Sequence, residues 1–98
     1  YIMQFKSKFN PLPGFKASYK FMIGKKPLSI KIDGGEAEYI LQPIENADVE
    51  VNIPEAIMQD IVAGRMTFQR AFMTGAMKIK GEFKILRALD ELYAFMNN

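Results

Sequence analysis

The sequence predicts an α+β fold in which helices cover one face of a five-stranded, mainly antiparallel sheet. Between Phe15 and Ile53, apolar and polar residues alternate in four short runs, a pattern typical of strands with one wet face. From Pro54 onward the apolar period changes to 3.6, which is typical of amphipathic helices. Strands followed by helices indicate two packed layers, with the helices on one side of the sheet.

The first residues are ambiguous. Residues 1–9 fit either a strand face or a loose helix face, and the proline-rich Asn10–Gly14 segment ends whichever element forms. Alternation then predicts a strand over Phe15–Ile23 and a second one over Leu28–Ile32, with a turn between them.

Gly34 and Gly35 predict the tip of a two-residue hairpin, because both glycines tolerate positive φ. A third strand is expected over Glu36–Leu41 and a fourth over Asp48–Ile53, where the alternation is cleanest. Short spacing and tight turns predict that these four strands form an antiparallel meander.

Pro54 suits the first turn of a helix, and Gly64 is expected to end it. A second short helix is predicted over Phe68–Met73, with Thr67 as its N-cap. Residues 76–80 predict a fifth strand, and residues 82–96 predict a long final helix. Its apolar stripe is wider than packing on one flank of a sheet requires.

Composition excludes several function classes. The 98 residues suit a single domain, and the sequence has no cysteine and no histidine. Thiolate nucleophiles, Ser-His triads and the commonest metal ligands are therefore absent, and no phosphate-binding loop or EF-hand spacing occurs. We expect no enzymatic activity, no catalytic or metal-binding residue and no cofactor. No apolar run is long enough to span a bilayer.

The charges are segregated along the chain. Residues 1–31 carry seven lysines and no acid, whereas residues 32–64 carry eight acids and no base. Such segregation predicts segments that pair across a sheet surface. Lysines interleaved with aromatics before Phe21 are also a pattern of nucleic-acid binding, but arginine is scarce there and the strand alternation buries many of the aromatics. We therefore expect no nucleic-acid partner.

Methionine and phenylalanine are abundant, with seven and eight residues. Both fill irregular cores, and both also suit a cavity for a flexible apolar ligand. A methionine-rich core is the simpler interpretation of the composition alone.

Residues 63–81 carry the most specific pattern. A glycine ends one helix, a short helix contains Ala71-Phe72, and a Lys-Ile strand lies between Gly75 and Gly81. This segment resembles the signature of the sterol carrier protein type-2-like family, and Ala47–Ile53 is similar to the strand that introduces it. The likeness is good over residues 47–96 and looser over 15–43, and Ala76 departs from the lysine common in the family.

The resemblance implies an apolar tunnel between sheet and helices that holds a sterol, a fatty acid or acyl-CoA. It favours a helix for residues 1–9, as the remnant of a longer first helix, and it indicates binding or transfer without catalysis. The alternative is an accessory or dimerisation module of the same fold. A homodimer and transient membrane contact stay open, and the absence of cysteine and of a visible targeting signal favours the cytoplasm. The residues expected to line the cavity are Ile61, Met66, Phe68, Phe72, Met73, Met77, Leu86, Leu89, Leu92 and Met96.

Overall fold

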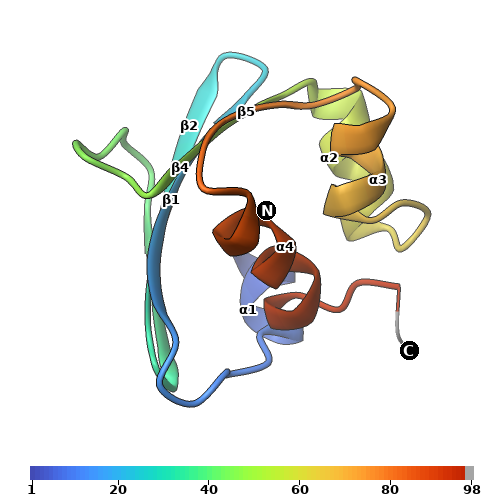
Figure 1. Cartoon of the computed structure of the whole chain (residues 1–98). Helices are drawn as coiled ribbons and strands as arrows, with labels where there is room; N and C mark the ends of the chain where they lie inside the picture. Colours follow the sequence, from blue (N-terminus) through green and yellow to red (C-terminus); the bar gives the residue numbers. More distant parts are fainter. Residues whose placement is uncertain (97–98) are drawn as a thin grey trace.

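The computed structural model describes residues 1–96 and confirms the α+β architecture (Figure 1). The sheet is seen nearly edge-on in Figure 1, and all the helices lie on one side of it. The helices are α1 (Ile2–Lys8), α2 (Glu55–Val62), α3 (Phe68–Met73) and α4 (Phe83–Leu92). The strands are β1 (Lys16–Ile23), β2 (Lys26–Asp33), β3 (Glu36–Ile40), β4 (Val49–Ile53) and β5 (Lys78–Gly81).

The sheet has the strand order β3-β2-β1-β4-β5, and every neighbouring pair is antiparallel except β1 and β4. The expected four-strand meander is therefore wrong at β4, which pairs with β1 in parallel. Residues 41–48 cross the face of the sheet opposite the helices to make this connection (Figure 1). Ser29 holds the crossing in place, since its hydroxyl donates to the Gln42 carbonyl at 2.6 Å and accepts from the Ile44 amide at 3.2 Å.

The Gly34–Gly35 hairpin is confirmed, because Asp33 pairs directly with Glu36. Only Gly34 has positive φ, at 60°, which is the signature of a turn with glycine at its first central position. The predicted pairing of segregated charges is also confirmed on the outer face. Lys20 of β1 forms an ion pair with Glu50 of β4.

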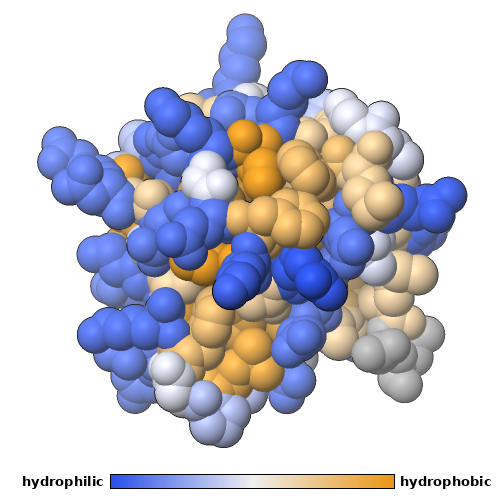
Figure 2. Space-filling view, viewed as in Figure 1, coloured by the Kyte–Doolittle hydropathy of each residue, from blue (hydrophilic) through white to orange (hydrophobic). Residues whose placement is uncertain are grey.

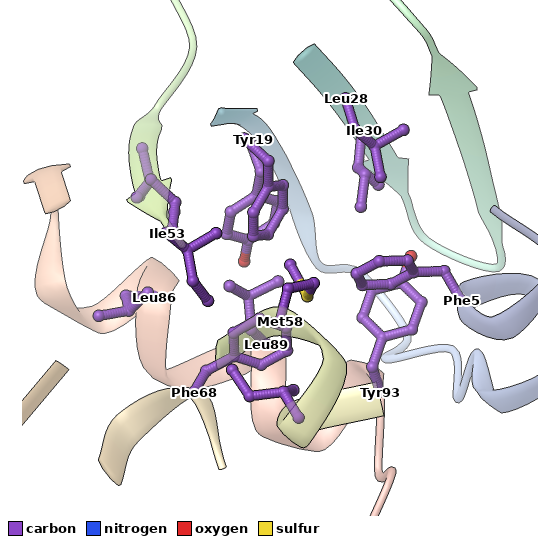
Figure 3. Packing of buried hydrophobic residues seen from close by; sticks show 14 of the residues in the cluster. Phe5, Tyr19, Leu28, Ile30, Ile53, Met58, Phe68, Leu86, Leu89 and Tyr93 are labelled. Atoms are coloured by element: carbon purple, nitrogen blue, oxygen red, sulfur yellow. The ribbon is translucent and has the colours of Figure 1, made fainter. Parts of the chain in front are cut away.

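The core lies between the sheet and the helices. Alternate residues of the three central strands point toward the helices, and Tyr19, Ile30 and Val49 share one row of this face. Phe68 and Leu89 approach them from α3 and α4, and all five side chains are fully buried (Tyr19, Ile30, Phe68 and Leu89 are labelled in Figure 3). The alternation in the sequence thus places the apolar layer on the helical side.

The structure refines the predictions for residues 1–9, the final helix and the fifth strand. Residues 1–9 contain a helix, α1, which settles their ambiguity. The final helix ends at Leu92 rather than Met96, because Tyr93 leaves the helical conformation and forms a β-bridge with Phe9. The fifth strand begins at Lys78 rather than Ala76, since the Met77 amide still donates to the Ala71 carbonyl after α3.

Candidate functional site

The ten residues expected to line a cavity occupy three environments. Two of them, Met73 and Met96, are exposed, and Met66 and Phe72 are half-buried. The other six are fully buried in the core: Ile61, Phe68, Met77, Leu86, Leu89 and Leu92. The structure therefore brings Met66, Met73 and Met96 together at the surface and places the six buried residues in the core, while Phe72 packs against Phe83 of α4.

Aromatic side chains fill much of the layer between α1, the sheet and the C-terminal residues. Phe5 lies edge-on to Tyr93 with ring centroids 4.8 Å apart, and its ring is 5.4 Å from that of Phe95. Figure 3 shows Phe5 and Tyr93 side by side, next to Leu89 and Met58. In this conformation the helix–sheet interface is occupied by the protein's own side chains, so a ligand there would have to displace them.

An open groove runs beside α3. Three methionines, Met66, Met73 and Met96, supply its apolar surface, and its volume is about 550 Å³. This lies within the range of about 300–1,000 Å³ that is usual for ligand sites. Polar side chains form the rest of the lining: Arg65, Thr67, Gln69, Arg70 and Thr74.

A smaller pocket of about 120 Å³ adjoins the groove and shares Met66, Thr67 and Met96 with it. Its inner wall includes Ile61, Tyr93 and other residues of the core side. The groove and this inner pocket together lead from the surface beside α3 toward the helix–sheet interface.

Local backbone interactions hold the walls of the groove. Thr67 caps α3 as predicted, since its hydroxyl accepts from the Arg70 amide at 3.0 Å. Asp90 of α4 also caps α3, because its two carboxylate oxygens accept from the Phe68 and Gln69 amides at 2.8 and 3.0 Å. Gly64 lets the C-terminal segment, residues 93–96, approach closely: a Cβ at this position would lie 2.7 Å from the Phe95 carbonyl oxygen.

The groove has one arginine that is paired and one that is not. Arg65 donates two hydrogen bonds to Asp60, at 3.0 and 2.9 Å. Arg70 is exposed and takes part in no ion pair within residues 1–96. Tyr93, which lines the inner pocket, forms a hydrogen bond with the hydroxyl of Tyr39; burial raises the pKa of the Tyr93 hydroxyl far above its usual value, and this hydrogen bond raises it further. Tyr93 therefore stays neutral, and Arg70 is the charged side chain of the groove that forms no ion pair within residues 1–96.

Three further depressions lie away from the predicted residues, and the smallest, of about 410 Å³, lies between Gln69 and α4. The other two are larger. One, of about 700 Å³, covers the outer face near the Gly34–Gly35 hairpin and is lined by lysines and carboxylates. The other, of about 430 Å³, lies between α1 and the β1–β2 turn and is mainly apolar. Across residues 1–96, no cluster of carboxylates has the geometry to hold a metal ion, and no helix has the length and hydrophobicity to cross a membrane.

Sequence reasoning missed the polar part of the groove. Arg70, Gln69 and Thr74 were not singled out, although Arg70 and Met73 are one helical turn apart and so lie on one face of α3. That spacing is the available signal. However, a basic and an apolar residue one turn apart also occur on many helix surfaces that bind no ligand.

This arrangement is that of an α+β domain in which one helical layer covers a five-stranded sheet and a groove lies beside α3. The match to a family model is direct: residues 4–94 match the SCP-2 sterol transfer family, and the chain belongs to this family. The family predicted from residues 63–81 is therefore confirmed.

One curated relative is a fatty acid-binding protein from Yarrowia lipolytica, which is 32% identical over 63 residues. The match covers 64% of this chain and 49% of the relative, so the chain spans about half the length of that protein. Family membership and this relative support lipid binding or transfer as the class of function.

Two solved structures show the same fold. The sterol carrier protein domain 2 of Helicoverpa armigera has a TM-score of 0.70 at 21% identity, with 87% of this chain and 72% of that chain covered. The inverting sec-alkylsulfatase Pisa1 from Pseudomonas sp. has a TM-score of 0.72 at 19% identity, with 83% of this chain but 13% of that chain covered. The fold thus also occurs as a small part of an enzyme.

Proposed function

We propose that this chain binds a single-chain anionic lipid, with a fatty acid as the best fit, in the groove beside α3. The observation that carries the proposal is the placement of Met66, Met73 and Met96 around one apolar surface, with Arg70 at its edge. Methionine is flexible and polarisable, so such a surface accommodates an acyl chain in more than one conformation.

The charge at the groove favours a carboxylate over an uncharged headgroup. Arg65 is already held by Asp60, whereas Arg70 is exposed and without an ionic partner in the described part of the chain. A guanidinium binds a carboxylate through two parallel hydrogen bonds. Arg70 would bind the carboxylate headgroup, and the acyl chain of the lipid would lie over the methionines and extend toward the inner pocket.

The size of the inner pocket limits how far the acyl chain of the lipid can enter the protein. At about 120 Å³ it is smaller than the groove, and Tyr93 and Phe95 close it from the core side. Movement of the C-terminal segment would open it toward the six buried residues expected to line the cavity. Lipid transfer would then be possible, because a lipid bound in a surface groove can leave without unfolding of the core.

A titration with fatty acids of increasing length tests the proposal. Burial contributes about 0.8 kcal/mol per methylene group, or roughly fourfold in affinity, until the groove is full. R70Q should weaken a fatty acid but leave the fatty alcohol of the same length unchanged. M96D should weaken both, and the matched control L41D, at an exposed apolar residue far from the groove, should weaken neither.

Absence of a length dependence, or equal losses in M96D and L41D, would overturn the proposal. The alternative, an accessory or dimerisation module, would then be favoured by a dimer in sedimentation equilibrium that M96D dissociates.

A further inference from the structure

We propose that Met73 and Met96, two methionines that line the groove beside α3, are sites of reversible oxidation by peroxide, and that their oxidation weakens the binding of an acyl chain. The inference rests on the proposed function, since it concerns regulation of the same groove. The reagent is a small hydroperoxide such as hydrogen peroxide, which adds one oxygen to a thioether sulfur. Met73 is 71% exposed and Met96 is 51% exposed, so a dissolved oxidant can reach both.

The seven methionines of the chain differ widely in exposure. Met58 and Met77 are buried in the core, and Met22 and Met66 are half-buried. Met3 is the most exposed, at 83%, but it lies on α1 and outside the groove. Because oxidation follows exposure, peroxide should react with Met3 and with the two exposed methionines of the groove before it reaches the core.

The sequence leaves methionine as the sulfur group that reacts with peroxide, because it contains no cysteine. A lone pair of the methionine sulfur attacks one oxygen of hydrogen peroxide, so that an S–O bond forms as the O–O bond breaks and hydroxide leaves. The hydroxide takes the proton of the transferred oxygen, and the products are a sulfoxide and water. The sulfur is oxidised by two electrons and the peroxide is reduced by two.

A sulfoxide at Met73 would change the groove in two ways. The Met73 sulfur already accepts a weak hydrogen bond from the side-chain amide of Gln69, at 3.9 Å. A sulfoxide oxygen is a stronger acceptor and would bind this amide, which makes the flexible apolar surface polar. It would also attract the guanidinium of Arg70, one helical turn away on the same face of α3. The oxidised side chain would thus compete with a carboxylate for its cation.

Met96 extends the effect to the inner pocket. It lines both the groove and the inner pocket, together with Met66 and Thr67. A sulfoxide at Met96 would place a polar oxygen where an acyl chain passes from one to the other. Figure 2 shows hydrophobic side chains at the surface on the side of the molecule where α3 and the C-terminal end lie. Oxidation would therefore remove apolar surface that is accessible to both lipid and oxidant.

The order of oxidation is measured first, without lipid, by peptide mass spectrometry after a brief exposure to hydrogen peroxide. Trypsin cleaves after Arg70 and Lys78, so Met73 and Met77 lie in one peptide, residues 71–78, and are compared in the same fragment spectrum. Met73 should gain oxygen well before Met77, since their side chains are 71% and 2% exposed. In a second sample, a saturating fatty acid should slow the oxidation of Met73 and leave that of Met3 unchanged.

Fatty-acid affinity is then measured on chains whose oxidation is stopped before Met66 reacts. Oxidation should weaken binding about tenfold, the equivalent of about 1.4 kcal/mol, because a polar group then faces the acyl chain. The double variant M73L/M96L keeps apolar side chains of similar volume without sulfur, so peroxide should leave its affinity unchanged. The matched control M3L should lose as much affinity as the unaltered chain. Methionine sulfoxide reductases for both epimers, with dithiothreitol as the reductant, should restore binding.

Three results would overturn the proposal: equal rates of oxidation at Met73 and Met77, unchanged affinity once Met73 and Met96 carry oxygen, or an equal loss in M73L/M96L. Urea denaturation of the oxidised chain should give an unchanged midpoint, and a lowered midpoint would assign the loss to unfolding instead. An unoxidised chain without affinity for fatty acids would overturn the proposed function and with it the effect on binding. The order of oxidation is measured without lipid, so the two failures are distinguishable.

Discussion

Replacing Gly64 with alanine tests how the C-terminal segment closes the inner pocket. Gly64 follows the end of α2 with a φ of +80°, and a Cβ there would lie 2.7 Å from the Phe95 carbonyl oxygen. Real Cβ atoms do not come so close to an oxygen, so the segment must move away. Gly75 offers an unusually close control, because it follows α3 with the same φ of +80° and its Cβ would meet nothing within 4 Å.

The difference between the two variants isolates the steric contact. G75A bears only the cost of a left-handed conformation with a Cβ, about 1–2 kcal/mol. G64A bears the same cost and that of forcing extra volume into a packed contact, about 1–3 kcal/mol more. We therefore expect G64A to be less stable than G75A by about 2 kcal/mol, or roughly 8–16 °C in Tm for a domain of this size.

Urea denaturation measures both losses as shifts of the midpoint, with the slope compared to establish that the unfolded states are alike. The same variants should differ in lipid binding, since a displaced C-terminal segment alters the inner pocket that Phe95 and Met96 line. Equal losses of stability in G64A and G75A would refute the close contact between Gly64 and Phe95.

Three further predictions concern the core and the outer face. F68A should reduce the free energy of unfolding by about 3–5 kcal/mol, measured by urea denaturation, because Phe68 is fully buried between α3 and the sheet. D90N should cost about 1 kcal/mol in the same assay, since it weakens one of the two acceptors that cap α3. Lys20 holds the pKa of the Glu50 carboxyl below its ordinary value of 4.5. The ion pair therefore stabilises the fold above pH 4.5, and this contribution is lost as the pH falls below that value. In thermal unfolding, the stability of E50Q should fall less steeply below pH 4.5 than that of the unaltered chain.

Most of the fold could be predicted because its signals are local. Alternation set the strand faces, the glycine pair at 34–35 fixed a hairpin, and Thr67 marked the start of a helix. The parallel pairing of β4 with β1 could not be predicted, because it rests on long-range contacts such as those of Ser29 with Gln42 and Ile44. These contacts join distant parts of the chain and leave no periodic trace.

The candidate site was less accessible to sequence reasoning. Apolar residues of the last third were grouped together, but periodicity does not distinguish a side chain that packs in the core from one that lines a groove. Leu89 and Met73 both fit an apolar stripe, yet one is fully buried and the other is 71% exposed. The distinction comes from how α3 and α4 pack on each other, held by Asp90.

The parallel pairing of β1 and β4 has a consequence for synthesis of the chain. β1 to β3 pair through consecutive hairpins and can associate as soon as they leave the ribosome. Tyr19 of β1, however, can pair with Val49 only after β4 has been synthesised. Until then one edge of the central strand presents unpaired backbone donors and acceptors, as well as an apolar face without its helices. Lys16 and Lys20 on β1 supply positive charge along this nascent edge, which discourages pairing between two growing chains.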